Sequence, residues 1–291
     1  MAPRVIFITG CSTGFGRSLV EATLAQGDIA IATLRKPEVI SDLKKKWGED
    51  RLLVMRLDIT KPEEVDAVFA AAKKHFGRLD VVINNAAIST LGEVEAISEK
   101  EDRQLMETNF FAPLSITKKA IAFFRDTNPV RGGALIQISS NTSHRAIPGF
   151  GTYSASKVSL DYITEALADE LDPDWNITVS IVQPGAFRTA MAANLGFIPP
   201  PPAYADPKLT TNHVRAALPT YPWVGDADKA ARAILKTLEW PKDKRRLRLI
   251  LGEDAMVTAR ARLEEWKKDI ELNEEVAKSV KLDEEMPKAK L

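Results

Sequence analysis

The chain has 291 residues, of which 45% are hydrophobic, and 40 basic residues balance 40 acidic residues to a formal net charge of zero. This length and apolar content suit one large α/β domain with an ample core, and the balanced charge argues against a nucleic acid or an anionic membrane as partner. The single cysteine, Cys11, excludes an internal disulfide framework and fits a reducing compartment, which predicts a cytoplasmic protein. Strand-like sequence begins already at Arg4 and no long apolar run follows, so we expect neither a leader peptide nor a membrane span.

Short apolar runs alternate with helical patterns along the chain. Helices are predicted over 16–26, from the end of the strand 29–33 to about residue 47, and over 62–76. The last of these has Thr60 as N-cap and Glu63 three residues later. The predicted strands are 4–9, 29–33, 52–57, 80–83, 133–139, 177–182 and 246–251. Because apolar strands separated by helices form parallel sheets covered on both faces, and crossovers are right-handed, the sequence predicts a doubly wound α/β sheet, the Rossmann fold.

Two segments depart from this alternation. Residues 186–225 are rich in proline and predict a lid over the site, whose rings either line the pocket or pack the lid onto the body. Its aromatic residues are Phe187, Phe197, Tyr204, Tyr221 and Trp223. The tail 257–291 is charged, and its stripe of Leu263, Trp266 and Ile270 predicts a surface helix docked on the body. We therefore expect one Rossmann-fold domain over 1–256, lid included, and a helical extension over 257–291.

A glycine-rich turn joins the first strand to the first helix. Its residues are Thr9, Gly10, Cys11, Ser12, Thr13, Gly14, Phe15 and Gly16. Glycines let the backbone approach a pyrophosphate closely, and the helix N-terminus offers free N–H groups to it. The turn therefore predicts a dinucleotide site, although a glycine turn can also be a mere connection, and Cys11 is interpreted as a small filler.

The end of the second strand bears on the choice of cofactor. An NAD site commonly has an acidic residue there, whereas this chain has Leu34 followed by Arg35. A guanidinium forms charge-assisted bonds to a 2′-phosphate, so Arg35 predicts NADP(H). The alternative is a solvated basic pair, Arg35 and Lys36, at a strand end.

Tyr153 and Lys157 lie four residues apart at the start of a long helical pattern, so both side chains share one helix face. Ser140 directly follows a predicted strand, and Asn109 lies in the helix before it. Lowering the pKa of a phenol from ~10 to ~7 takes about 4 kcal/mol. One ammonium about 4 Å away supplies roughly that energy at an effective dielectric of ~20, so Lys157 suffices to activate Tyr153.

Together these motifs resemble the short-chain dehydrogenase/reductase family, and among its members the NADP-preferring hydroxysteroid and retinol dehydrogenases. The landmarks are Gly10, Gly14, Gly16, Asp58, Asn84, Asn85, Ala86, Asn109, Ser140, Tyr153, Lys157, Pro184, Gly185 and Thr189. The chain departs from the pattern at 141–145, where Thr142, His144 and Arg145 make the rim more polar, and at Gln183. We interpret His144 as a solvent-facing loop residue, and we expect no metal because no cluster has ligand spacing.

The resemblance implies a role for each landmark. Tyr153 would be the acid or base, Lys157 would bind the nicotinamide ribose and lower the pKa of Tyr153, Ser140 would position the substrate, and Asn109 would order a water in a proton relay. The implied cofactor residues are Gly10, Ser12, Thr13, Gly14, Phe15, Gly16, Arg35, Asp58, Asn85, Ala86, Tyr153, Lys157, Pro184, Gly185, Phe187 and Thr189.

The sequence thus predicts an NADP(H)-dependent oxidoreductase that transfers hydride to or from a carbonyl or secondary alcohol, with a hydrophobic ketone, aldehyde or alcohol as substrate. One alternative is a regulatory module that senses NADP(H) without turnover, and another is an epimerase or dehydratase on the same fold. A homodimer or homotetramer is expected through the helix that holds Tyr153. The residues that would contribute there, unless they face the sheet, are Leu160, Ile163, Ala166 and Leu167.

Overall fold

A computed structural model describes residues 2–191, 194–241 and 246–281. Its main feature is a seven-stranded sheet in the order β3-β2-β1-β4-β6-β7-β9, with every neighbouring pair parallel. The strands are β1 (Val5–Thr9), β2 (Ile29–Leu34), β3 (Leu52–Arg56), β4 (Val81–Asn84), β6 (Gly133–Ile138), β7 (Ile177–Pro184) and β9 (Arg248–Leu251). The predicted doubly wound α/β sheet is confirmed, strand by strand.

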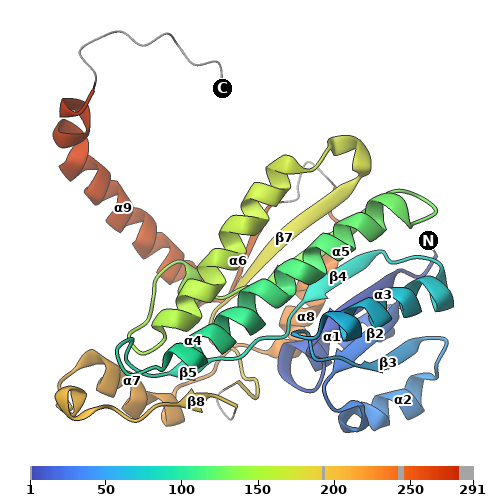
Figure 1. Ribbon diagram of the computed structural model, residues 1–291, viewed down its shortest axis with the longest axis horizontal. Coiled ribbons are helices and arrows are strands. Elements are labelled where there is room, and N and C mark those ends of the chain that lie inside the picture. Colours follow the sequence, from blue (N-terminus) through green and yellow to red (C-terminus); the bar gives the residue numbers. More distant parts are fainter. Residues whose placement is uncertain (1, 192–193, 242–245, 282–291) are drawn as a thin grey trace.

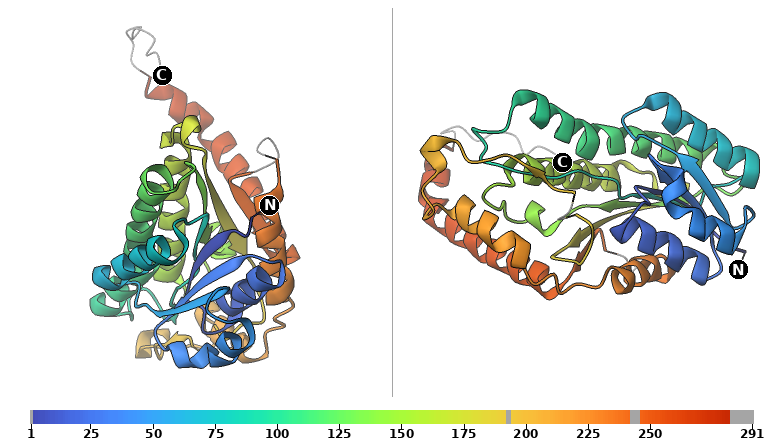
Figure 2. Two further views of the ribbon diagram at one scale, coloured as in Figure 1. Left: turned by 90° about the vertical axis from the view of Figure 1, so that its right-hand side faces the viewer. Right: turned by 90° about the horizontal axis from the view of Figure 1, so that it is seen from below.

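Helices cover both faces of this sheet (Figures 1 and 2). The helices are α1 (Gly14–Ala25), α2 (Ser41–Trp47), α3 (Pro62–Phe76), α4 (Glu99–Met106), α5 (Ala112–Asp126), α6 (Gly151–Glu170), α7 (Thr210–Ala217), α8 (Ala227–Lys236) and α9 (Glu253–Ser279). Short 3-10 helices occupy Pro37–Ile40, Asn141–Ser143, Pro173–Trp175, Pro202–Tyr204, Leu218–Thr220 and Thr237–Glu239, and a π-helical turn occupies Glu107–Phe111.

β1 shows why the strands read as continuous apolar runs. All five of its residues are buried, because alternate side chains enter two separate cores. Ile6 and Ile8 pack with α1 and α8 on one face, whereas Val5 and Phe7 pack with α3 and α5 on the other. Each strand must therefore be apolar on both sides, which erases the alternation typical of half-exposed strands.

Strand-like backbone pairing ties the lid segment to the body at two places. A second, two-stranded sheet pairs β5 (Thr90–Leu91) with β8 (Gly196–Phe197). At the base of the lid Phe187 bridges to Gly225, with Arg188 N donating to Gly225 O at 2.9 Å and Gly225 N donating to Ala186 O at 3.0 Å. The segment 186–225 therefore leaves and rejoins the body at one point; residues 192–193 lie outside the described residues.

The expected N-cap of the third helix is wrong. α3 begins at Pro62 with Lys61 in the N-cap position, and no side-chain cap is formed. The Thr60 hydroxyl instead donates to Asp58 Oδ1 at 2.8 Å. Threonine thus stabilises the loop that follows β3 rather than the helix end.

The C-terminal helix also differs from expectation. α9 buries only Ala255 and Ala259 near its start and then projects past the edge of the sheet (Figure 1). The side chains of the expected docking stripe are exposed: Leu263, Trp266 and Ile270. The proposed division at 256/257 falls within α9 and stays a prediction, and residues 282–291 of the extension lie outside the described residues.

The interpretation of His144 as solvent-facing is wrong as well. Its ring is half-buried at the end of the short helix Asn141–Ser143, near Asp161 and Gln183.

Among the described residues, no helix is both long and apolar enough to span a bilayer.

Candidate active site

A cavity of about 950 Å³ opens at the carboxyl ends of the strands. The chain passes from β1 outward to β2 and β3 and then returns to β4, so a crevice between β1 and β4 is the topological switch point where such sheets bind ligands. The wall of this cavity carries nearly all the residues that the sequence singled out.

The glycine turn forms one wall. Gly10 and Gly14 have φ angles of +71° and +54°, and a Cβ on Gly10 would lie 2.8 Å from Ala86 Cα. Gly16 does not line the cavity; a Cβ there would collide with the carbonyl oxygen of Gly10, so this glycine lets α1 approach β1. Asn85 Nδ2 holds the turn by donating to Thr9 O at 2.9 Å.

The outer end of this wall carries charges of both signs. Arg35 is exposed and lines the cavity together with Asp58. Burial opposes ionisation of Asp58, but hydrogen bonds from Thr60 and the positive charges of Arg35 and Lys61 hold its pKa below the usual value. A ribose hydroxyl and a phosphate could therefore find an acceptor and a cation side by side.

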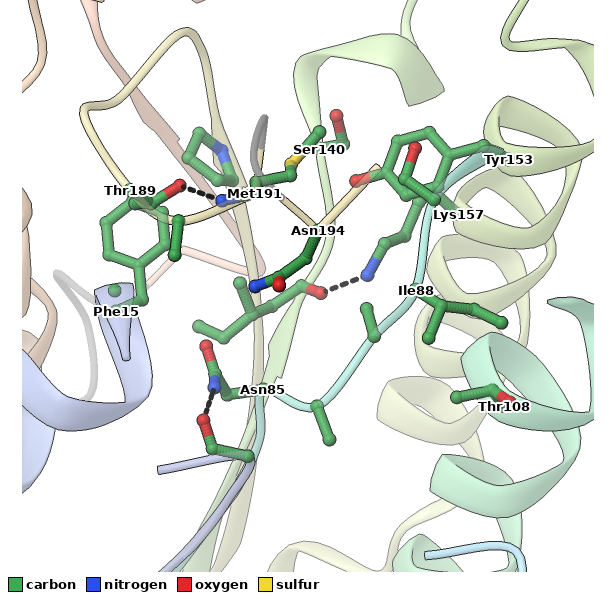
Figure 3. A pocket seen from close by; sticks show the side chains of 18 of the residues that line it. Phe15, Asn85, Ile88, Thr108, Ser140, Tyr153, Lys157, Thr189, Met191 and Asn194 are labelled. Carbon is green, nitrogen blue, oxygen red and sulfur yellow. Dashed lines mark hydrogen bonds between the residues drawn. The ribbon is translucent and has the colours of Figure 1, made fainter. Parts of the chain in front are cut away.

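Tyr153 and Lys157 project from α6 on the opposite side of the cavity from Phe15 and Thr189 (Figure 3). Both side chains are buried, and Lys157 Nζ lies 5.8 Å from the centroid of the Tyr153 ring and donates to Ile138 O at 2.8 Å. Ser140 follows β6 and lines the same wall. The expected trio is thus brought together.

The ionisation of this pair differs from the sequence expectation. Burial raises the pKa of Tyr153 to about 12, and a hydrogen bond with Ser140 only partly opposes it. Burial also lowers the pKa of Lys157 to about 8, against the charge of Asp161. Among the groups of the protein itself, Lys157 therefore does not bring the pKa of Tyr153 below its usual value.

The fourth expected catalytic residue, Asn109, does not line the cavity. Its side chain is fully buried within the π-helical turn, accepting from Ile88 N at 2.9 Å and donating to Ile88 O at 2.8 Å and Ser156 Oγ at 3.1 Å. Asn109 therefore fastens the loop after β4 to α6.

Ser140 has a neighbour that the sequence did not assign to it. Thr142 lines the cavity and donates from both its backbone N and its hydroxyl to Ser140 Oγ, each at 3.1 Å. These two bonds fix the Ser140 hydroxyl. The polar rim expected from 141–145 is thus represented by Thr142, while His144 and Arg145 are absent from the described wall.

The outer part of the cavity is built from the lid and from α4. Of the aromatic residues of the lid, Phe187, Tyr221 and Trp223 line the cavity. Phe187 also packs on Phe15, with ring centroids 5.1 Å apart. Phe197 is exposed, and the Tyr204 hydroxyl donates to Glu95 at 2.7 Å. Wall residues that the sequence did not single out include Ile88, Gln104, Glu107, Thr108, Ile147, Phe150, Met191, Asn194, Val214 and Leu218. No local motif marks them, because only the tertiary fold brings them to the site.

No group of three or more His, Cys, Asp or Glu side chains within the described ranges could hold a metal ion. The functional groups of this cavity are the glycine turn, the charged outer end, and the cluster of Tyr153, Lys157 and Ser140.

Comparison with known proteins agrees with this geometry. Residues 4–196 match the family model described as short chain dehydrogenase. An uncharacterized oxidoreductase of Schizosaccharomyces pombe is 34% identical over 284 residues, which are 96% of this chain and 92% of that protein. A crystal structure of a short-chain dehydrogenase from Streptomyces avermitilis has a TM-score of 0.86 at 34% identity, covering 96% of this chain and 99% of that one. A short-chain dehydrogenase from Burkholderia cenocepacia, solved with NADP, has a TM-score of 0.71 at 26% identity, covering 92% and 96% of the two chains.

Proposed function

This chain belongs to the short-chain dehydrogenase family and is an oxidoreductase of that family, and on this premise we propose that it is an NADP(H)-dependent carbonyl reductase or alcohol dehydrogenase. The observation that carries the proposal is the single cavity in which Tyr153 and Ser140 face a glycine turn. A proton donor and a hydrogen-bonding hydroxyl thus share one chamber with a dinucleotide cradle.

The residues of this cradle fit a nicotinamide dinucleotide. Gly10 leaves no room for a Cβ against Ala86, and the N-terminus of α1 offers its free N–H groups beside Gly14. The cavity volume of about 950 Å³ lies near the upper end of the range for ligand sites, so a dinucleotide and a substrate fit together. Arg35 at the outer end supports a 2′-phosphate and hence NADP(H).

The bound nicotinamide supplies or accepts the hydride. Tyr153 exchanges the proton with the substrate oxygen, and Ser140 holds that oxygen through a hydroxyl that Thr142 fixes in place. A phenol is protonated at neutral pH and burial raises the pKa of Tyr153 further, so the protein presents a proton donor to a carbonyl oxygen. Lys157 provides the positive charge beside the phenol.

The outer walls favour an apolar substrate. Ile147, Phe150, Leu218, Tyr221 and Trp223 present aliphatic and aromatic surface to the space beyond Ser140. Burial of a substrate there would contribute about 25 cal/mol per Å² of apolar area removed from water. We therefore propose a hydrophobic ketone, aldehyde or secondary alcohol, in line with the hydroxysteroid-type resemblance.

The test is NADPH absorbance with a panel of carbonyls and alcohols, followed by Tyr153→Phe. Tyr153→Phe should abolish turnover, by at least roughly 10²-fold, while leaving NADPH affinity nearly unchanged. The matched control is Tyr162→Phe on the exposed side of α6. Near-normal activity of Tyr153→Phe would refute the mechanism.

Other outcomes of the panel lead to other functions. NADPH binding without consumption of any carbonyl would favour a sensing module, and product without net cofactor oxidation would favour an epimerase or dehydratase. Turnover of small polar sugars alone would defeat the apolar substrate class.

A cytoplasmic homo-oligomer stays our expectation from the sequence. On α6, Leu160 is buried, whereas Ile163 and Ala166 are exposed. An α6 interface would therefore use the latter pair.

A further inference from the structure

Behind Lys157 lies a buried acidic residue that the proposed chemistry does not use. Asp161 follows Lys157 by one helical turn on α6, so the two side chains share one face of the helix. Asp161 is 3% exposed and, unlike Lys157, does not line the cavity in the described structure. An isolated carboxylate at such depth is costly, so its surroundings must account for it.

Those surroundings partly offset the cost of an ionised carboxylate, while burial still leaves its pKa raised. Gln183 Nε2 donates to Asp161 Oδ2 at 2.7 Å, and the hydroxyls of Ser139 and Ser143 lie close enough to stabilise negative charge. Burial raises the pKa of Asp161, and these three donors together with the charge of Lys157 oppose that rise. Gln183 is itself fixed, since it also donates to Ser143 Oγ at 3.0 Å.

Lys157 in turn needs a partner. Its ammonium has three protons to donate, but within the described part of the chain the hydrogen bond that it forms is the one to Ile138 O. Lys157 is only 3% exposed, so water has little access to the other protons. Burial lowers the pKa of Lys157 to about 8, and the charge that opposes this is that of Asp161. Without Asp161, the pKa of Lys157 would therefore fall further.

Two other titratable side chains interact with Asp161. His144 lies half-buried at the end of the short helix after β6, and burial lowers its pKa, so it is neutral near pH 7. Arg248 on β9 is already paired with Glu165, at 2.8 Å from Nη2 to Oε2. Neither replaces Asp161 as the counter-charge of Lys157.

We propose that Asp161 is a positioning residue that keeps Lys157 protonated and thereby preserves the positive charge beside the phenol of Tyr153. The proposal rests on the proposed function, because only a reaction at Tyr153 needs that charge. No bond is made or broken by Asp161, which acts through Lys157 and touches neither substrate nor cofactor.

The test compares Asp161→Asn with Asp169→Asn, which removes the same charge from an exposed position on the same helix. The first readout needs no turnover: the ¹³Cε resonance of Lys157, assigned with Lys157→Arg, is titrated in the cofactor-free protein. The Lys157 midpoint should fall by about 1 pH unit or more in Asp161→Asn and stay unchanged in Asp169→Asn. Asp161→Glu should restore part of the shift.

The second readout is the pH profile of NADPH oxidation. Loss of the Lys157 proton should move the alkaline limb of the profile to lower pH by the same amount, with activity near pH 6 little changed. An unchanged Lys157 midpoint in folded Asp161→Asn overturns the proposal, as does a wild-type ¹³C carboxyl titration that shows Asp161 neutral at pH 7.

That wild-type titration decides the matter even if Asp161→Asn does not fold. A protein without carbonyl turnover would overturn the proposed function, while the Lys157 titration would still report on Asp161.

Discussion

The lid is held to the body by a buried ion pair whose removal should open it. Arg215 on α7 contacts both carboxylate oxygens of Glu93 at 2.5 Å, and the two side chains are only 8% and 4% exposed. Arg215 also donates to Asn212 Oδ1 at 2.9 Å and to Ile198 O at 3.2 Å. Arg215→Met keeps most of the volume but leaves the Glu93 carboxylate buried and unpaired.

The free-energy cost of Arg215→Met follows from the burial of the pair. Removing one partner of a buried pair costs about 3 to 5 kcal/mol, which corresponds to roughly 10²- to 10⁴-fold in an opening equilibrium. α7 itself buries no residue, so the lid should open long before the sheet unfolds. The loss should therefore be local.

Hydrogen exchange measured by mass spectrometry checks this prediction. In Arg215→Met, backbone amides of 195–218 should exchange roughly 10²-fold faster or more, whereas those of β1 and β4 should not change. Arg103→Met, which breaks the exposed pair with Glu99, is the control and should have almost no effect. The reasoning is wrong if the two variants behave alike, or if adding Glu93→Gln to Arg215→Met fails to recover part of the protection.

The same pair gives the lid a pH dependence of known sign. Arg215 holds the pKa of Glu93 below the usual value of 4.5, so the carboxylate is ionised at neutral pH. A lowered carboxyl pKa contributes stability that is present above its usual value and is lost as the pH falls through the lowered one. The protection factors of the lid amides, which correct for the intrinsic pH dependence of exchange, should therefore be constant from pH 5 to 8 and fall only in more acidic solution.

Two further predictions concern the glycine wall. Arg35→Asp should shift the preference from NADPH toward NADH, measured as the ratio of the two kcat/KM values, with Lys36→Asp as control; an unchanged ratio would remove Arg35 from the site. Cys11 is fully buried and burial raises the pKa of its thiol to about 12, so the thiolate fraction at pH 8 is about one in ten thousand. Alkylation of Cys11 should therefore follow unfolding, and rapid labelling of the native protein would contradict its role as a filler.

The fold was predictable where burial dictates composition. The side chains of β1 and its neighbours pack into cores on both faces of the sheet. These strands are therefore apolar at nearly every position, which makes them visible in the sequence as continuous apolar runs. β5 and β8 have two residues each and escaped detection, since a strand that short carries no periodicity. The cap at Thr60 failed because its hydroxyl had a competing acceptor, Asp58, in the loop.

The site was predictable only in its local parts. The positions of Tyr153 and Lys157 follow from helical spacing, and the glycine turn follows from strand-to-helix order. The ionisation of Tyr153 does not, because it depends on burial by distant segments. The partners of Asn109 could likewise not be predicted, because Ile88 and Ser156 lie 21 and 47 positions away in the sequence.

The junction of Phe187 and Gly225 has an evolutionary consequence. Because both ends of the intervening segment meet there, a change in its length alone costs little more than the entropy of closing a loop. A foreign segment grafted between these two points would begin and end where the native one does, but it would have to replace the packing of Leu195, Val214 and Leu218 around Tyr153. Relatives could thus exchange this cassette and acquire new specificities while inheriting the same reaction.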